Sequence, residues 1–171
     1  MKRIVIIGSA GSGKTTLALA LASRLQLPLT HLDRHFWLPG WKEKDNLQFL
    51  SEIETIAERE SWIIEGNYSQ TLPMCLKRAD FFIYLRPNRI RCVLRVIKRH
   101  LKHRGKERED LAPGCPEGIS LSYLQWVWNF DKKSGPKLQG HFDAFKRRKQ
   151  ELASPTDVRI FLGKVDERKT S

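Results

Sequence analysis

Residues 8–15 read Gly8-Ser9-Ala10-Gly11-Ser12-Gly13-Lys14-Thr15 and match the pattern G-x-x-x-x-G-K-[ST]. An apolar, β-branched run at 3–7 comes before them, and a run from Thr16 to Leu25 follows in which leucines recur every four residues. The first run is typical of a central parallel strand, and the second is typical of a helix with one apolar face. The sequence therefore predicts a strand, a glycine-rich turn and a helix in direct succession.

A turn of this kind suits the binding of phosphate. Its glycines allow backbone N–H groups to approach an anion closely, and the helix that follows adds the positive end of its dipole. We expect Lys14 to reach the β- and γ-phosphates of a nucleoside triphosphate and the Thr15 hydroxyl to ligate Mg²⁺. The alternative is a glycine-rich turn without a ligand. The predicted site for ATP and Mg²⁺ consists of Gly8, Ser9, Ala10, Gly11, Ser12, Gly13, Lys14, Thr15 and Thr16.

Length and composition limit the class of protein. A chain of 171 residues suits one domain, which we expect to cover 1–171. It has no apolar run long enough to span a membrane, and its apolar start is followed at once by glycines, unlike a signal peptide. Three cysteines without C-x-x-C spacing argue against disulfides and favour a cytoplasmic location. A zinc site that combines Cys115 with His100, His103 or His141 is an alternative.

Two carboxylates end predicted strands. Asp33 closes the strand predicted over 27–33, and Glu65 closes the strand predicted over 62–65. Because the carboxyl ends of parallel strands line the ligand crevice, both side chains are expected beside the phosphate turn. We favour Asp33 for positioning the acceptor or taking its proton and Glu65 for Mg²⁺ through water, but the sequence does not separate these roles.

The segment over 34–60 is the predicted acceptor-binding region. Arg34, Phe36 and Trp37 begin it, followed by a Pro-Gly turn and a helix predicted from Asp45 to Glu60. Aromatic rings beside a cation can form a wall for a base or a small substrate. They can equally well cover the core beneath the next helix, and the two interpretations stay open here.

The middle of the chain is strongly basic. A strand over 80–85 leads to Arg86, and residues 86–108 hold ten Lys and Arg against one acid. The helix that begins at Asn88 has two stripes: a basic one, and an apolar one expected to face the core, made of Ile90, Val93, Leu94, Ile97 and Leu101. The glycine- and proline-containing stretch over 104–118 is predicted to be a lid, in which Arg104 and Arg108 neutralise phosphates during transfer. A disordered surface loop is the alternative.

The rest of the chain completes an alternating pattern. We predict a helix over 119–130, a second helix that runs to about Glu151, and a fifth strand over 158–163. Five strands that alternate with helices predict an α/β fold in three layers, with a five-stranded parallel sheet.

Several motifs together resemble a known group. The phosphate turn, the Trp62-Ile63-Ile64-Glu65-Gly66 strand and the lid are similar to the adenylate-kinase-like nucleoside monophosphate kinases. More closely, the chain up to about residue 150 resembles the DNA topology modulation (FlaR-type) proteins, a P-loop kinase-like family. The motifs that carry this resemblance are His31-Leu32-Asp33, Phe36 to Trp41, Glu65-Gly66-Asn67-Tyr68, Asp110 to Glu117 and Trp126-Val127-Trp128-Asn129-Phe130.

The resemblance implies a P-loop kinase fold, ATP binding and a bacterial role linked to DNA topology. It places Gly66 and Asn67 near the acceptor. Adenylate kinases carry an arginine just after their acid-glycine pair, whereas Ser69 and Gln70 stand here, so Arg34 or Arg86 is the candidate substitute.

Three functional hypotheses follow. The first is an ATP-dependent phosphotransferase that uses Lys14, Asp33, Arg104 and Arg108 and acts on a small acceptor, with a nucleotide favoured. The second is a nucleotide-switched protein that binds DNA or RNA through residues 86–108. The third is a small-metabolite kinase of the shikimate or gluconate type. No hypothesis includes a membrane partner, and the sequence leaves the oligomeric state open.

Overall fold

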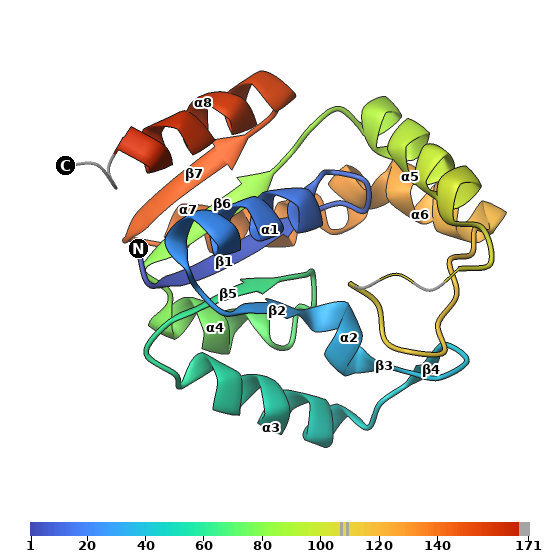
Figure 1. Cartoon of the computed structure of the whole chain (residues 1–171), viewed down its shortest axis with the longest axis horizontal. Helices are drawn as coiled ribbons and strands as arrows, with labels where there is room; N and C mark the ends of the chain where they lie inside the picture. Colours follow the sequence, from blue (N-terminus) through green and yellow to red (C-terminus); the bar gives the residue numbers. More distant parts are fainter. Residues whose placement is uncertain (107, 109, 168–171) are drawn as a thin grey trace.

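The computed structural model of the chain describes residues 1–106, 108 and 110–167. Its centre is a parallel sheet of five strands in the order β2-β5-β1-β6-β7 (Figure 1). The strand bounds are β1 Arg3–Gly8, β2 Leu29–His31, β5 Trp62–Glu65, β6 Phe81–Leu85 and β7 Arg148–Leu152. The phosphate turn therefore follows the central strand, β1. This confirms the predicted α/β fold with a five-stranded parallel sheet.

Helices cover both faces of the sheet, and some of them extend beyond it (Figure 1). Their bounds are α1 Lys14–Leu25, α2 Leu32–Phe36, α3 Asn46–Ala57, α4 Leu72–Arg78, α5 Arg89–His103, α6 Leu121–Lys133, α7 Gly135–Ala144 and α8 Pro155–Glu167. A two-stranded antiparallel hairpin, β3 Trp37–Leu38 and β4 Lys42–Glu43, lies at the end of the molecule near the lid segment. The helices of the described residues are all too short or too polar to cross a membrane.

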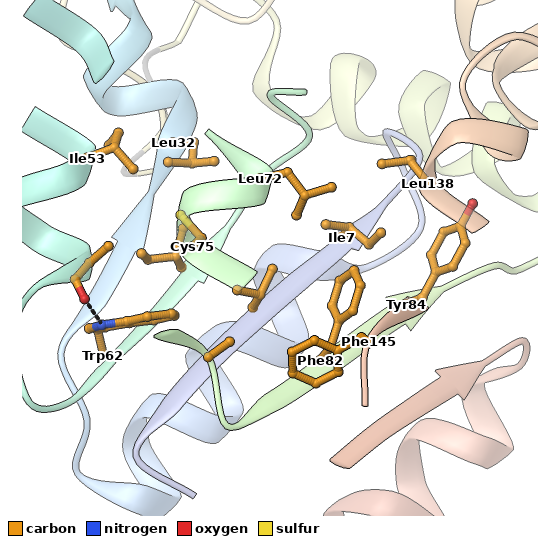
Figure 2. Close-up of a cluster of buried hydrophobic side chains, with 14 of the residues drawn as sticks. Ile7, Leu32, Ile53, Trp62, Leu72, Cys75, Phe82, Tyr84, Leu138 and Phe145 are labelled. Carbon is orange, nitrogen blue, oxygen red and sulfur yellow. Dashed lines mark hydrogen bonds between the residues drawn. The ribbon is translucent and has the colours of Figure 1, made fainter. Parts of the chain in front are cut away.

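Alternate residues of β1 face two separate cores. Val5 and Ile7 pack with side chains of α3, α4 and α7 on one face. Ile4 and Ile6 pack with α1 and α8 on the other. Figure 2 shows the first core, in which Ile7 of the sheet lies near Leu72. In the same core Trp62 donates its indole N–H to the Ala57 carbonyl at 3.1 Å. A strand that is buried on both faces needs such a continuous apolar run.

The prediction for the C-terminal third is wrong in one respect. The fifth strand is β7, inside the stretch predicted to be helical, and residues 158–163 belong to α8. Ser154 and Asp157 form a capping box: the Asp157 amide donates to Ser154 Oγ at 3.1 Å, and Asp157 Oδ2 accepts from the Ser154 amide at 2.8 Å. β7 is an edge strand with only Leu152 buried, so its residues lack the apolar signal of a strand.

The apolar stripe of α5 also lies elsewhere than expected. Cys92 and Val96 make the buried contacts of this helix. Ile90, Leu94 and Leu101, predicted to face the core, are 53%, 61% and 72% exposed. Helical geometry places them on the side opposite Cys92 and Val96. The core accepts two small side chains of α5 and leaves the larger aliphatic ones outside.

Smaller differences affect the site. β2 ends at His31, so Asp33 lies in the first turn of α2 rather than at the end of a strand. The second C-terminal helix ends at Ala144 instead of near Glu151.

Candidate active site

A cavity of about 1750 Å³ runs along the carboxyl edge of the sheet. One end is lined by residues that follow β7, the middle by the phosphate loop after β1, and the other end by residues that follow β2. Because β2 and β7 are opposite edges of the sheet, these ends lie on the two sides of the loop. Predicted site residues that line the cavity are Ala10, Gly11, Ser12, Gly13, Lys14, Thr15, Thr16, Asp33, Arg34, Trp37, Glu65, Gly66, Asn67 and Arg108.

The loop over 8–13 depends on glycine at specific positions. Gly11 has φ +73°, and a Cβ there would lie 2.3 Å from the Cys92 carbonyl oxygen, so this position requires glycine. Gly8 lies below the cavity lining, where its amide donates to Asn67 Oδ1 at 3.0 Å and its carbonyl accepts from the Asn67 side chain. The buried hydroxyls of Ser9 and Ser12 have no hydrogen-bond partner among the described residues. Such unpaired donors in a tight loop suit an anionic ligand.

Cationic groups surround this loop. Lys14 Nζ donates to the Ser9 carbonyl at 3.2 Å, folded back over the loop. From α5, Arg95 donates to the Ser12 carbonyl at 3.1 Å and lies 3.6 Å from the point where a Gly13 Cβ would be. Arg99 and Arg108 line the cavity as well. This concentration of positive charge matches the requirements of a polyphosphate chain.

Oxygen donors converge on Thr15. Its hydroxyl lies 3.1 Å from Glu65 Oε1 and 3.3 Å from Asp110 Oδ2. His31 Nδ1 lies 2.8 Å from the same Glu65 oxygen, since β2 and β5 pair in a register that puts His31 beside Glu65. A hydroxyl and two carboxylates are ligands that Mg²⁺ prefers, so these residues fit the cation that the loop implies.

The lid segment carries a network of ion pairs. Arg108 binds both carboxylate oxygens of Asp110 and donates to Glu117 at 2.5 Å, and Arg99 donates to Glu117 at 2.9 Å. Glu117 is only 5% exposed. Burial alone would raise the pKa of Asp110, but the Arg108 guanidinium outweighs it, so the pKa is lowered and the carboxylate stays charged. The network holds Arg108 beside Thr15. Glu107 and Glu109 of the predicted lid lie outside the described residues.

Asp33 lies at the other end of the cavity with Tyr68. The Tyr68 hydroxyl donates to Asp33 Oδ1 at 2.7 Å. Burial raises the pKa of Asp33 above its ordinary value of 3.8, and the nearby Glu65 carboxylate adds to the shift, while Tyr68 and Lys14 oppose it. A carboxylate with a raised pKa in a cavity is a candidate proton acceptor.

This shift predicts how an Asp33→Asn variant responds to pH. The native state binds the Asp33 proton more tightly than the unfolded state, so the parent loses stability as the pH rises from 3.8 through the raised pKa. The amide oxygen of the introduced asparagine can still accept from Tyr68, and the amide carries no charge. We expect a higher thermal midpoint than the parent at pH 7 and a difference that shrinks toward pH 4. Thermal unfolding across this range measures it, and equal midpoints at pH 7 would contradict the prediction.

The hairpin β3–β4 is fastened to the lid. The Gly40 amide donates to the Gly114 carbonyl at 2.8 Å, the Trp41 indole to the Pro116 carbonyl at 3.2 Å, and the Cys115 thiol to the Leu38 carbonyl at 3.2 Å. Trp37 and Trp41 pack edge to face at 5.4 Å, and both line the cavity. We call this set of contacts the hairpin–lid junction. Two segments more than 70 residues apart therefore form one wall.

Gly114→Ala should open the hairpin–lid junction. Gly114 has φ +75°, and a Cβ there would lie 2.7 Å from Pro39 Cβ. We expect a stability loss of roughly 1–2 kcal/mol from the backbone conformation, together with faster amide exchange in both the hairpin and residues 110–118. Gly105→Ala is the matched control, because Gly105 has φ +68° with nothing within 4 Å of the added Cβ. Hydrogen exchange that rises in the lid alone would show that the two segments are independent.

Several predicted residues lie outside the cavity lining. Phe36 packs against Phe49 and Tyr68 in the core, which favours its structural interpretation. Arg86 donates to Gln139 and lies 3.7 Å from Glu151, and Arg104 is exposed at the end of α5. Gly66 lines the cavity, but its φ of +142° and the close approach of Leu32 indicate a packing role. Asn67 holds Gly8, as described above.

Other residues of the site were not predicted from the sequence. Arg95 and Arg99 were predicted only as part of a basic stripe, although their four-residue spacing puts them on one side of a helix. Asp110 and Glu117 were within the predicted lid without a role, and His31 and Tyr68 appeared only in motifs. No group of three or more His, Cys, Asp or Glu side chains that could hold a metal ion occurs in the described part of the chain, and the Cys115 thiol donates a hydrogen bond to the Leu38 carbonyl, so the zinc alternative has no support.

Comparison with known sequences gives a relative. No family model matches the chain. The uncharacterized protein YqaC of Bacillus subtilis (strain 168) is 30% identical over 138 residues, which cover 76% of this chain and 73% of YqaC. The chain belongs to the YqaC family. The name YqaC does not state an activity.

Solved structures show the fold of the YqaC family member described here. Shikimate kinase from Acinetobacter baumannii in complex with shikimate superposes with a TM-score of 0.61, at 17% identity over 99% of this chain and 93% of that one. A shikimate kinase from Bacteroides thetaiotaomicron superposes with a TM-score of 0.60, at 16% identity over 99% of each chain. A gluconokinase from Sinorhizobium meliloti superposes with a TM-score of 0.53, at 17% identity over 99% of this chain and 95% of that one. The chain thus has the P-loop kinase fold.

Proposed function

We propose that this protein is a kinase that transfers the γ-phosphoryl group of ATP to a small acceptor. The observation that carries the proposal is one continuous cavity that joins Lys14 and Thr15 of the phosphate loop to Asp33 and the two tryptophans. A hydrolase or a motor needs only the first part of this cavity. A second compartment with its own carboxylate is what a phosphoryl acceptor requires.

The phosphate loop and four cationic side chains act on the donor. Backbone N–H groups of the phosphate loop after Gly8 would bind the β- and γ-phosphates, and Lys14 would stabilise the negative charge that develops on the transferring group. Arg95 and Arg99 of α5 would bind the phosphates from the side, and Arg108 would bind from the lid. Leu152, Pro155 and Val158 line the end of the cavity beyond the loop and provide apolar surface for the base.

The acceptor would lie between Trp37, Trp41 and Asp33. Where it presents a hydroxyl, its oxygen forms a bond to the γ-phosphorus as the bond from that phosphorus to the bridging oxygen of ADP breaks. The hydroxyl proton passes to the Asp33 carboxylate, which Tyr68 holds in place. Arg34 also lines this end and forms no hydrogen bond or ion pair with the described residues, so it is free to bind an acidic group of the acceptor.

Mg²⁺ would be held by the Thr15 hydroxyl with Glu65 and Asp110, directly or through water. When bound, it supplies charge neutralisation for the phosphates. His31 orients Glu65 through its hydrogen bond.

The other two hypotheses differ in their support. A metabolite kinase of the shikimate or gluconate type shares every donor contact and differs only in the acceptor. A nucleotide is the other candidate acceptor, although the chain has Ser69 and Gln70 where adenylate kinases carry an arginine. A nucleic-acid function, including the topology role that the FlaR-type resemblance implies, has less support, because Arg95, Arg99 and Arg108 of the basic segment are engaged at the cavity.

The experiment that tests the proposal has two stages. Thermal unfolding with and without MgATP measures donor binding, and a coupled assay of ADP release then compares nucleoside monophosphates, nucleosides and small hydroxylated metabolites. We expect MgATP to raise the midpoint and one acceptor class to accelerate ADP release. A protein that MgATP does not stabilise would refute the proposal.

A further inference from the structure

The outer side of α5 presents aliphatic side chains to solvent. Ile90, Leu94, Ile97 and Leu101 follow one another at spacings of four, three and four residues, which puts them on one side of the helix. Three of them are more than half exposed, and Ile97 is partly exposed. They lie opposite the small buried pair Cys92 and Val96. We call this set the outer stripe of α5; a helix of a globular protein normally turns such a stripe inward.

Basic residues border the outer stripe on one side. Arg91, Lys98 and Lys102 are exposed and form no ion pair with the described residues. A shallow hollow of about 460 Å³ is lined by Ile90 and Leu94 together with Arg91, Arg95 and Lys98. Apolar and cationic groups therefore share one small surface, and the complementary ligand is an anion attached to hydrocarbon.

We propose that the outer stripe of α5 docks on the surface of an anionic lipid bilayer. A helix with a strong apolar side, a Lys/Arg-rich polar side and low overall hydropathy is the type that lies in the interface of a membrane. The formal net charge of +12 would attract the whole chain to a surface of anionic head groups. Figure 1 shows α5 at the periphery of the molecule, away from the central sheet, where a flat surface can reach it.

Two other occupants fit the outer stripe less well. A second copy of this chain would bring a second net charge of +12 and the same basic border against the first. A nucleic acid would satisfy the cations but leave the aliphatic side chains against phosphates. An anionic lipid satisfies both kinds of group at once.

Vesicle sedimentation tests the proposal. We expect the full chain to sediment with vesicles of phosphatidylcholine and phosphatidylglycerol at low ionic strength and to stay in solution with pure phosphatidylcholine. Leu94→Asp, which adds a negative charge in the middle of the outer stripe, should lower the bound fraction at least ~10-fold. Leu47→Asp on α3 is the matched control, because Leu47 is 75% exposed and lies on another helix. Unchanged circular dichroism and thermal midpoints would establish that both variants fold.

Three outcomes would overturn the proposal. The first is absence of binding to the anionic vesicles. The second is equal binding by Leu94→Asp, which would make the attraction purely electrostatic, and sedimentation with duplex DNA that also survives this substitution would then favour a nucleic acid. The third is a dimer in sedimentation velocity that Leu94→Asp dissociates, which would assign the outer stripe to a second copy.

Discussion

Lys14→Ala is expected to lower ATP turnover by about 10²–10³-fold, the cost of removing one cationic donor from a preorganised phosphate site. Lys14 follows Gly13 at the start of α1, and its ammonium group lies back over the loop on the Ser9 carbonyl. No other lysine lines the cavity in the described part of the chain, so none can replace it. ADP release measures the loss, with the acceptor that the comparison of acceptor classes identifies or, without one, with water.

The control for Lys14 is Lys137→Ala, which removes an exposed lysine from α7 outside the cavity. We expect this variant to keep the parent rate. Turnover by Lys14→Ala at the parent rate would remove the phosphate loop from the proposed mechanism, whereas a loss shared by both variants would indicate damage to the fold.

Arg108→Ala is the second substitution with a large expected effect. Its guanidinium lies beside Asp110 and Glu117, and the other partner of Glu117 is Arg99. Without Arg108 the buried Glu117 would lose one of the two cations that pair with it among the described residues, and in the proposed mechanism the transferring phosphoryl group would lose its contact with the lid. We expect kcat to fall by about 10²-fold or more, with a smaller change in the affinity for ATP.

Two measurements separate a loss of catalysis in Arg108→Ala from a loss of order in the lid. Isothermal titration with MgATP gives affinity, and the ADP-release assay gives kcat. Arg104→Ala is the informative companion, because Arg104 is exposed and does not line the cavity. A larger kcat loss in Arg104→Ala than in Arg108→Ala would reverse the assignment of the lid arginine.

The local part of this structure could be predicted from the sequence. A β-branched run, a glycine-rich turn and a four-residue leucine repeat determine β1, the loop and α1 through contacts close in the chain. The strand-end rule put Glu65 near Thr15, where the structure places it. Asp33 was expected at the same edge, and it lines the same cavity from α2.

What could not be predicted depends on partners far along the chain. β7 is an edge strand that buries only the side chain of Leu152. Arg148–Leu152 is therefore mostly polar and lacks the apolar pattern from which a strand is predicted. The orientation of α5 follows from the space that the core offers to Cys92 and Val96, which periodicity does not reveal. Arg108 pairs with Asp110 and Glu117, Asp110 also contacts Thr15, and Glu117 also accepts from Arg99. These contacts join α1, α5 and the lid, and the sequence does not show which of the neighbouring charges would make them.

The hairpin–lid junction has a thermodynamic consequence for the proposed donor and acceptor. The hairpin carries Trp37 and Trp41 at the proposed acceptor end, and the lid carries Arg108 at the phosphate end. Because Gly40, Trp41 and Leu38 are bonded to the lid, a molecule seated against the tryptophans also favours the position of the arginine. Linkage then requires reciprocity: the acceptor should lower the dissociation constant of ATP by the same factor by which ATP lowers that of the acceptor.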